Sequence, residues 1–343
     1  MRLSGENLRS IVAAAGIVLL LAACGGDDDG SSAGSTQPEK AEFKIGLVTD
    51  VGQLNDRGFN QLAYEGLKRA EKELGVEIRV AQSRTAADYV PNHTTLARQG
   101  FDLMIGVGFA QGESVATAAK SFPESRYAII DVDQTTLPGK PANVLGVLFR
   151  EEQAGYLAGV LAGLSVKDSP PVVGSVGGYK EPPVDRFIAG YQAGAKFSKP
   201  GIKTLNGYSS DWDDQAKCKE LALDQIARGA SVVFQVAGGC GLGALDAAGE
   251  RNAWRIGVDA DQSFLGKFVL TSAMKRVDEA VFRIIRSVTD DTWKGGQNVT
   301  FGLAEDGVGL GKINPDVPQE HRSMLEDVQR KILAGEIEIP RSL

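Results

Sequence analysis

Short apolar runs rich in β-branched residues alternate with amphipathic stretches along most of this 343-residue chain. The runs have the length of strands, whereas the stretches between them repeat their apolar residues at helical spacing. Because parallel strands need long crossover connections, this alternation predicts an α/β fold with mostly parallel sheets flanked by helices. The predicted strands cover residues 44–49, 77–81, 102–107, 127–131, 144–148, 172–176, 232–236, 255–258 and 268–272.

A group of polar residues and one aromatic ring follows the first predicted strand. Asp50, Asn55, Asp56, Phe59 and Asn60 lie between this strand and an amphipathic helix. Ligands bind at the carboxyl ends of strands in open α/β sheets, so these side chains should converge on the mouth of a cleft. They suit a small ligand with a flat face and several hydroxyl groups. Since no histidine lies nearby, we interpret the motif as a binding site rather than a catalytic one.

The pattern breaks near Phe149, which indicates two lobes. Residues 151–164 are apolar nearly all round after their first turn, as expected of a helix buried between layers. A second α/β set follows over residues 172–261, and residues 268–293 are expected to form one more strand and helix that return to the first lobe. We therefore expect a first lobe of residues 42–148 plus about 265–300, and a second of residues 149–264 plus about 301–343. A cleft that can hinge closed should separate them.

The N-terminus has the pattern of a secretory signal. Arg2 and Arg9 precede an apolar core over residues 11–20 that is too short to span a bilayer. Leucine and two alanines precede Cys24, which resembles the bacterial lipobox, whose cysteine is lipidated and becomes the new N-terminus. The alternative is an ordinary signal peptide that happens to contain a cysteine. We expect a signal peptide of residues 1–23, a flexible tether of residues 24–41 and an extracytoplasmic protein anchored by lipid to the cell membrane.

Charge and histidine content narrow the function. The formal net charge of the chain is −7, and residues 1–23 carry +1, so the mature chain carries about −8. It has no lysine or arginine run that could follow phosphates, so nucleic acid is not an expected partner. The chain has 2 histidines, His93 and His321, and neither has metal-ligand spacing to a cysteine. We expect no metal and no cofactor.

Cys218 and Cys240 remain once Cys24 is assigned to lipid. Outside the cytoplasm, an even pair of cysteines is more often oxidised than free. We predict a disulfide between them that joins a helix start to a nearby loop. Two unrelated buried thiols are the alternative.

Nine segments in a fixed order resemble the basic membrane protein family of substrate-binding lipoproteins, which includes purine nucleoside receptors of ABC transporters. They are TDVGQLNDRGFNQ, AIID, FREEQAGYLAG, the glycine pair 177–178 followed by FIAGYQAGA, YSSDWDDQAKCKE, AGGCGLG, IGVDADQ, TSAMK and ILAGEIEIP. Together they span essentially the whole mature chain. The resemblance implies a type I periplasmic binding protein fold with two Rossmann-like lobes and a ligand cleft between them. It also implies a monomer that delivers a nucleoside to a permease and ATPase.

The resemblance also implies roles for individual residues. Phe59 and Trp212 match the two aromatic plates that sandwich the base, and Asp259 and Lys275 match the groups that hold the ribose. The polar positions of the first loop are Asp50, Asn55 and Asp56. Asp131, Gly178 and Gly238 lie on segments expected to line the cleft.

Each of these roles has an ordinary structural alternative. Phe59 could be a core residue and Trp212 a rim residue, while Asp56 could cap the first helix. Lys275 could be a solvated lysine at a helix start, and Asp131 a turn residue. Asp56 could cap the helix and still contact a ligand.

The sequence also departs from the family pattern beside both proposed plates. Gly58 stands where a serine is usual, and the two cysteines stand where small residues are common. Two other functions therefore stay open. One is a binding protein for a sugar or another small polar ligand, and the other is an enzyme resembling a nucleoside hydrolase or phosphorylase.

Overall fold

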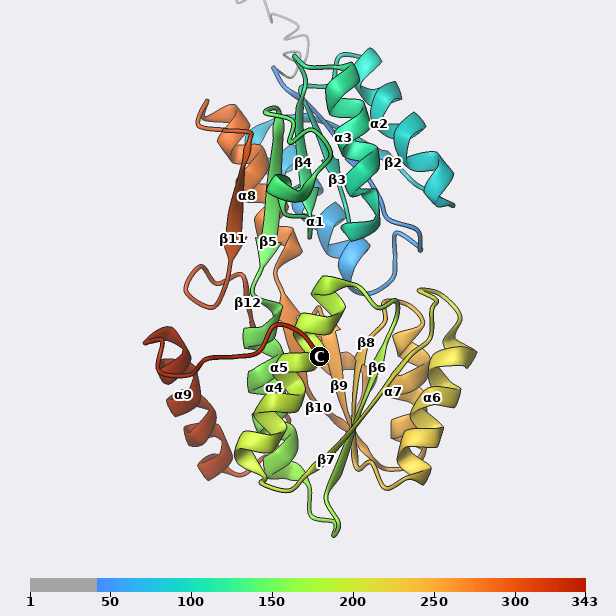
Figure 1. Cartoon of the computed structure of the whole chain (residues 1–343), viewed down its shortest axis with the longest axis vertical. Coiled ribbons are helices and arrows are strands. Elements are labelled where there is room, and N and C mark those ends of the chain that lie inside the picture. The colour runs from blue at the N-terminus through green and yellow to red at the C-terminus, as the bar shows by residue number, and fades with distance from the viewer. Residues whose placement is uncertain (1–41) are drawn as a thin grey trace, which may run out of the picture. The chain divides into compact units, whose positions relative to one another are not determined.

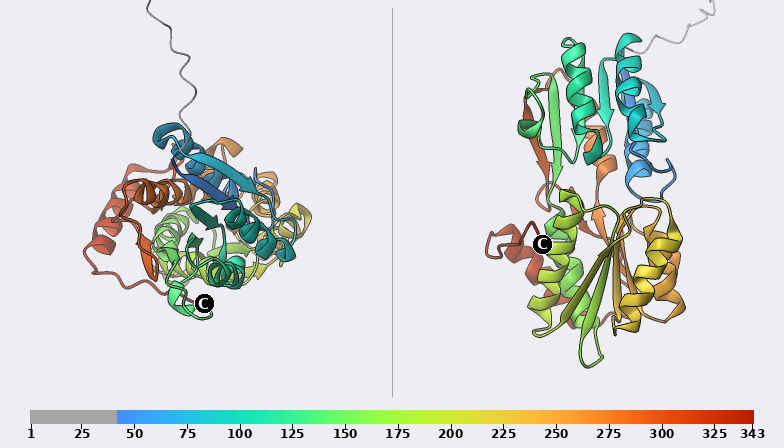
Figure 2. Two further views of the ribbon diagram at one scale, coloured as in Figure 1. Left: turned by 90° about the horizontal axis from the view of Figure 1, so that it is seen from above. Right: turned by 45° about the vertical axis from the view of Figure 1, so that its right-hand side comes forward.

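Residues 42–343 are described by a computed structural model, and they form two α/β lobes, one drawn above the other in Figure 1. The predicted signal peptide, the tether and the lipidation site Cys24 lie outside the described residues. Within residues 42–343, none of the helices combines the length and the apolar character that crossing a bilayer requires. Two sheets of six strands each form the centres of the lobes, and helices cover both faces of each (Figure 2). This arrangement confirms the predicted fold class.

The first lobe is built on a fully parallel sheet. Its strand order is β11-β5-β4-β3-β1-β2, and β1 lies between β2 and β3 at the point where the order reverses. Such a reversal opens a crevice at the carboxyl ends of the strands. The elements are β1 (Lys44–Val48), α1 (Phe59–Leu74), β2 (Glu77–Ala81), α2 (Tyr89–Arg98), β3 (Leu103–Gly106), α3 (Gly112–Ser121), β4 (Arg126–Ile130), β5 (Val144–Phe149), α8 (Val277–Thr289) and β11 (Gln297–Phe301), with 3-10 turns at Ala86–Asp88, Phe109–Gln111 and Gln134–Thr136.

The second lobe repeats this plan with the strand order β12-β10-β9-β8-β6-β7. β12 runs antiparallel to β10, and the other neighbouring strands are parallel. β6, between β7 and β8, takes the place that β1 has in the first lobe. The elements are α4 (Glu151–Ser165), β6 (Val172–Gly177), α5 (Pro182–Ser198), β7 (Lys203–Tyr208), α6 (Gln215–Ala227), β8 (Val232–Val236), α7 (Gly241–Glu250), β9 (Trp254–Asp259), β10 (Val269–Lys275), β12 (Val308–Leu310) and α9 (Gln319–Leu333), with a 3-10 turn at Ser263–Leu265.

The chain passes between the sheets three times, and one of these passages corrects the expected lobe boundary. The passages join β5 to α4, β10 to α8 and β11 to β12. The sequence predicts that the strand of residues 268–272 returns to the first lobe, but this strand, β10, pairs with β9 in the second sheet. Only α8 and β11 return. The apolar pattern identifies a strand but does not reveal its neighbour in the sheet. That neighbour decides which sheet the strand joins.

Two largely buried helices, α4 and α5, contact each other through glycines. α4 is buried along most of its length, as its all-round apolar pattern predicts. A Cβ atom on Gly159 would lie 2.0 Å from the Tyr191 carbonyl oxygen of α5, and one on Gly194 would lie 2.0 Å from the Tyr156 carbonyl oxygen of α4. The backbones of α4 and α5 therefore touch directly, and any side chain at these positions would push the helices apart.

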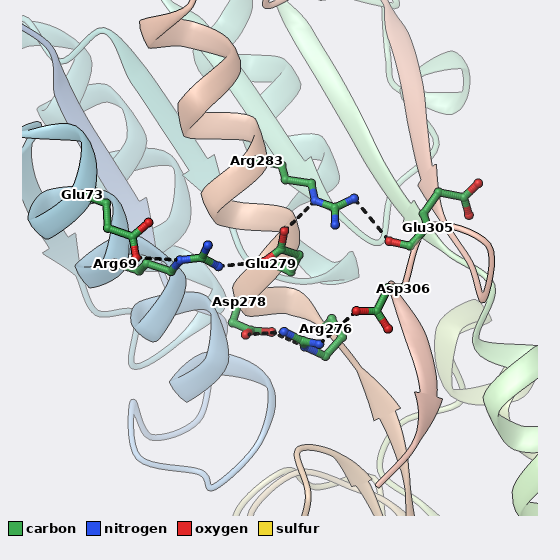
Figure 3. A network of polar contacts seen from close by, with 8 residues as sticks. All are labelled: Arg69, Glu73, Arg276, Asp278, Glu279, Arg283, Glu305 and Asp306. Atoms are coloured by element: carbon green, nitrogen blue, oxygen red, sulfur yellow. Dashed lines mark hydrogen bonds and ion pairs between the residues drawn. The ribbon is translucent and has the colours of Figure 1, made fainter.

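A network of surface ion pairs joins α8 to α1 and to the third passage (Figure 3). Arg69 of α1 contacts Glu279 of α8 at 2.7 Å, and Arg276, just before α8, pairs with Asp306 at 3.5 Å. The Arg276 backbone N–H also donates to the Gly307 carbonyl at 2.8 Å. Exposed ion pairs contribute about 1 kcal/mol or less each to stability. This network therefore adds little stability and mainly orients the segments that connect the two lobes.

Gly159→Val should lower the free energy of unfolding by roughly 2–3 kcal/mol, because the new side chain would overlap the α5 backbone and separate α4 from α5. Chemical denaturation followed by circular dichroism measures this loss. Gly309→Val is the control, since a Cβ atom there meets nothing within 4 Å. Equal stabilities of the two variants would contradict the direct contact of the helix backbones.

Candidate ligand-binding site

The carboxyl end of β1 carries an acidic group that the protein holds firmly. The Asp50 backbone N–H donates to Asn60 Oδ1 at 3.0 Å, and Asp50 Oδ1 accepts from the Val51 N–H at 2.7 Å and from the Tyr89 hydroxyl. A Cβ atom on Gly108 would lie 2.2 Å from Asp50 Oδ2, so only glycine leaves room for this carboxylate. Burial, partly offset by these hydrogen bonds, raises the pKa of Asp50 to about 6.

The other polar residues of this loop have different positions. Asp56 accepts the backbone N–H groups of Gly58, Asn60 and Gln61 at 2.9, 2.9 and 3.2 Å, so it caps the start of α1. The capping role that the sequence left open is thus present, although Asp56 also lines the cavity described below. Asn55 is exposed and is not among the residues that line that cavity.

Trp212, in the loop after β7, packs against two glycines. A Cβ atom on Gly178 would lie 2.2 Å from its Cζ3 atom, and one on Gly238 would lie 3.7 Å from its Cε3 atom. Gly178 follows β6 and is not among the cavity-lining residues, so its contribution is to let the indole approach the backbone. Gly238 has φ +55 and lines the cavity. The two glycines that the sequence singled out therefore frame the tryptophan.

A disulfide fixes the segments around Trp212. The structure joins Cys218 of α6 to Cys240, which precedes α7, with their Cα atoms 5.6 Å apart. The Cys240 backbone N–H donates to the Trp212 carbonyl oxygen at 2.7 Å. The position of the indole is thus tied to the covalent link between α6 and α7.

Lys275 is one of the most buried charged side chains of the protein, with an exposed fraction of 2%. Its Nζ atom lies 2.6 and 2.7 Å from the two carboxylate oxygens of Asp131, at the end of β4, and 3.0 Å from Glu151 Oε1, in the first turn of α4. Arg186 of α5 reaches Glu151 from the other side at 3.1 Å. Although burial opposes the charge, these carboxylates raise the pKa of Lys275 above its ordinary value. The cluster joins both lobes at the first two passages.

Glu151 was missed by the sequence analysis. Two adjacent glutamates open an otherwise apolar buried helix, and that contrast is the signal that could have revealed it. A fully buried carboxylate needs a cationic partner, since desolvation of an unpaired charge costs several kcal/mol.

Asp259, the last residue of β9, faces the first lobe. Its backbone has φ +61, a conformation that non-glycine residues adopt where the surrounding structure enforces it. A Cβ atom on Gly58 would lie 3.5 Å from Asp259 Oδ2, so the carboxylate reaches the start of α1. Burial, offset in part by Lys275, raises the pKa of Asp259 to about 7.

These residues line one cavity between the lobes, with about 660 Å³ of space including its open part. The sequence-predicted residues in its lining are Asp50, Asp56, Phe59, Asn60, Asp131, Trp212, Gly238, Asp259 and Lys275; residues that the sequence analysis did not propose include Gly108, Phe109, Glu181, Phe187 and Asp213. Two aromatic plates, Phe59 from α1 and Trp212 from the second lobe, therefore reach the same space.

The charge of the lining restricts the ligand. Six carboxylic acids and one lysine line the cavity: Asp50, Asp56, Asp131, Glu181, Asp213, Asp259 and Lys275. This excess of carboxylates favours a neutral or cationic ligand rich in hydrogen-bond donors and disfavours phosphate. Among residues 42–343, no cluster of three or more histidine, cysteine, aspartate or glutamate side chains is arranged to hold a metal ion.

Comparison with known proteins gives consistent relationships. Residues 43–342 match the family model described as "ABC transporter substrate-binding protein PnrA-like". The chain is 34% identical over 331 residues to the ABC transporter nucleoside-binding protein BmpA of Lactococcus lactis, covering 90% of this chain and 92% of that protein. It is 32% identical over 318 residues to basic membrane protein B of Borreliella afzelii, covering 90% and 91%. An uncharacterized lipoprotein of Pyrococcus horikoshii is 36% identical over 284 residues, or 79% of this chain and 69% of that protein.

Solved structures agree with the family match. A solute-binding protein of an ABC transporter from Aeropyrum pernix superimposes with a TM-score of 0.78 at 27% identity, covering 86% of this chain and 92% of that one. A second solute-binding protein, from Conexibacter woesei, has a TM-score of 0.68 at 25% identity and covers 87% and 99%.

Gly178→Ala should displace the Trp212 ring, because the added methyl group would overlap the indole. We expect altered near-ultraviolet circular dichroism and stronger acrylamide quenching of tryptophan fluorescence. A Trp212→Phe variant identifies the signal of this one residue, and Gly309→Ala is the control. Spectra of Gly178→Ala that match those of the unmodified protein would contradict the close packing of Trp212 on Gly178.

Loss of the disulfide should lower the free energy of unfolding by roughly 3 kcal/mol, the value expected for a loop of this length. A Cys24→Ala background leaves Cys218 and Cys240 as the remaining cysteines. In that background the denatured, unreduced protein should show no titratable thiol, and Cys218→Ser should unfold at lower denaturant concentration. Two thiols in the unreduced protein would rule out the bridge.

Proposed function

The chain belongs to the PnrA-like family of ABC transporter substrate-binding proteins, and from this premise we propose that it captures a nucleoside, with a purine as the favoured base. It is a binding protein and not an enzyme, since the family model, the relative from Lactococcus lactis and the structure from Aeropyrum pernix are all described as binding proteins of ABC transporters. The earlier alternative of a hydrolase or phosphorylase is therefore set aside. The relative from Lactococcus lactis carries the nucleoside-binding name that motivates the choice of ligand.

The observation that carries the proposal is the pair of aromatic rings in one acidic cavity. Phe59 and Trp212 enter the cavity from different lobes. A base between two rings gains roughly 1–3 kcal/mol from stacking, with little dependence on its identity. The hydroxyl groups of a ribose supply the donors that a lining rich in carboxylates requires.

The ribose contacts are proposed for Asp259 and Lys275. Asp259 accepts no hydrogen bond from the described residues, so both of its oxygens are available to the two vicinal hydroxyls of a ribose. Lys275 already donates to Asp131 and Glu151, so it contacts the sugar only by giving up one of these bonds. In our proposal Asp259 makes the principal contact, and Lys275 keeps Asp131 and its surroundings in place.

The acidic lining also bears on which nucleoside derivative is bound. A nucleotide would bring a doubly charged phosphate into a cavity with six carboxylic acids, and Coulomb repulsion would oppose it. The unphosphorylated nucleoside avoids this cost. A pyranose, the other open ligand, would use the same rings and carboxylates, and it is included in the test below.

An ABC transporter substrate-binding protein takes a small molecule to a membrane transporter. For this chain we propose a permease and an ATPase as partners, a monomeric state, and anchoring on the extracytoplasmic face through a lipid on Cys24. Support comes from relatives that are named lipoproteins and basic membrane proteins, and from the lipobox pattern before Cys24.

Incubation with inosine, guanosine or adenosine should raise the melting temperature without releasing free base, as measured by thermal shift and chromatography. Phe59→Ala and Trp212→Ala should each weaken binding at least about tenfold, or about 1.4 kcal/mol, since each removes one stacking plate. Phe264→Ala removes a ring that is 62% exposed and absent from the cavity lining, so it is the matched control.

Three results would contradict the proposal in different ways. Released base would identify an enzyme. A shift with ribose or galactose but with no nucleoside would favour a sugar ligand. Unchanged affinity in both ring variants would remove the sandwich while leaving the ligand class intact.

A further inference from the structure

Most polar side chains of the cavity already have protein partners. Asp56 accepts three backbone N–H groups, and Asn60 accepts one from Asp50. Both oxygens of Asp131 accept from Lys275. A carboxylate has about four acceptor positions and an ammonium group three donors, so Lys275 has no donor left, Asp56 has about one acceptor position left and Asp131 about two. Lys275 and Asp56 therefore shape the cavity more than they bind its contents.

Glu181 is an exception among these groups. It precedes α5 in the second lobe and lines the cavity, and no hydrogen bond or ion pair to its carboxylate is found within residues 42–343. Asp50 lines the same cavity from the first lobe. Its Oδ1 atom is occupied by the Val51 N–H and the Tyr89 hydroxyl, whereas its Oδ2 atom faces Gly108 without a donor from the described residues. Two carboxyl groups on different lobes are therefore available in one cavity.

The charges around this pair oppose the ionisation of both carboxyl groups. Burial first, and then the charges of Asp50 and Asp131, raise the pKa of Glu181 to about 7, with Lys275 acting in the opposite direction. The pKa of Asp50 is raised to about 6, and the Tyr89 hydroxyl that donates to it limits that rise. Like charges in one buried cavity disfavour ionisation of both groups, so between the two pKa values Glu181 holds a proton while Asp50 is ionised.

We propose that Glu181 is a specificity-determining residue that, together with Asp50, reads the Watson–Crick edge of the bound base through one shared proton. The inference rests on the proposed function, in which Asp259 takes the ribose. Asp213 lines the cavity but is exposed to solvent, so Glu181 and Asp50 are the more enclosed carboxyl groups available for the base. Every nucleobase presents a donor beside an acceptor on this edge. The ionised carboxylate accepts from the donor, and the protonated carboxyl donates to the acceptor.

Two properties follow from a shared proton. Either carboxyl group can carry it, so the pair accommodates both 6-oxopurines and 6-aminopurines, whose donor and acceptor are exchanged. Capture also takes up a proton when both groups are ionised beforehand. Binding should therefore be strongest near pH 7, because loss of the Glu181 proton weakens it above that value, and protonation of Asp259 and then of Asp50 weakens it below.

The sign of the pH dependence follows from the free and bound states. The complex holds a proton that the free Glu181 loses above a pKa of about 7, so affinity falls as the pH rises through that value. As the pH falls, Asp259 takes up a proton below a pKa of about 7 and Asp50 below about 6, which leaves weaker acceptors for the ribose hydroxyls and for the base N–H. Affinity should decline on both sides.

Titration calorimetry of the whole mature protein with inosine tests the proposal. At pH 8, measurements in two buffers with different ionisation enthalpies should show uptake of about one proton for each ligand bound. Affinity should fall roughly tenfold between pH 7 and pH 8.5. The ligand 1-methylinosine, which lacks the N1 donor, should bind at least about tenfold more weakly than inosine.

Matched variants separate the role of Glu181 from a general effect of charge. Glu181→Gln supplies an amide donor that does not titrate, so it should bind inosine at pH 8 without proton uptake and with little change of affinity from pH 7 to pH 8.5. Glu181→Ala should lose at least about tenfold in affinity at every pH. Asp213→Asn removes another carboxylate of the same lining and should retain the proton uptake.

Failure of this inference can be told apart from failure of the proposed function. A protein that binds no nucleoside overturns both. Inosine binding without proton uptake, proton uptake that persists in Glu181→Gln, or equal binding of 1-methylinosine would each overturn the role of Glu181 while the nucleoside receptor stands.

Discussion

A buried ammonium group at the junction of the two lobes is the interaction on which the rest of this structure depends. Lys275 ends a strand of the second sheet, Asp131 directly follows a strand of the first, and Glu151 begins the helix that follows the first passage. A lysine with 2% exposure cannot stay charged without such partners, and removal of one partner from a buried pair typically costs 3–5 kcal/mol. The strand ends must therefore lie close together for the charges to pair, and the paired charges in turn hold the strand ends in place.

This cluster also determines how the cavity is divided between structural and ligand-binding groups. Because Lys275 and Arg186 together balance the charges of Asp131 and Glu151, the remaining carboxyl groups have no further cation among the residues that line the cavity. Burial and mutual repulsion then raise the pKa values of Asp50, Glu181 and Asp259. The cavity gains acceptors that a neutral ligand with many donors satisfies. On the apolar side, the Lys275 Nζ atom also lies 5.0 Å from the centre of the Phe59 ring, so one of the two plates is held by the same group.

The strands that the sequence predicted and those it missed differ in their positions in the sheets. The nine predicted segments, 232–236 among them, correspond to strands that carry the apolar pattern, and β10 alone among them was given to the wrong lobe. The three missed strands, β7, β11 and β12, all lie at sheet edges. An edge strand such as Gln297–Phe301 is partly exposed and carries polar residues, so its pattern differs little from that of a loop.

The sequence and the tertiary structure likewise decide different aspects of function. The order of apolar segments and the polar residues after the first strand were sufficient to predict two α/β lobes and a cleft at the carboxyl ends of the strands, and the resemblance of nine segments predicted a family of binding proteins. Only the folded chain decided which polar groups are free: Asp56 turned inward to cap α1, Lys275 was occupied by Asp131 and Glu151, Gly178 lay beneath Trp212, and Glu181 remained without a partner among the described residues. Local pattern reports which face of an element is apolar, whereas hydrogen bonds and ion pairs join residues far apart in the chain: 144 positions separate Lys275 from Asp131, and 210 separate Arg69 from Glu279. Such pairings depend on distances that exist only after the lobes have packed.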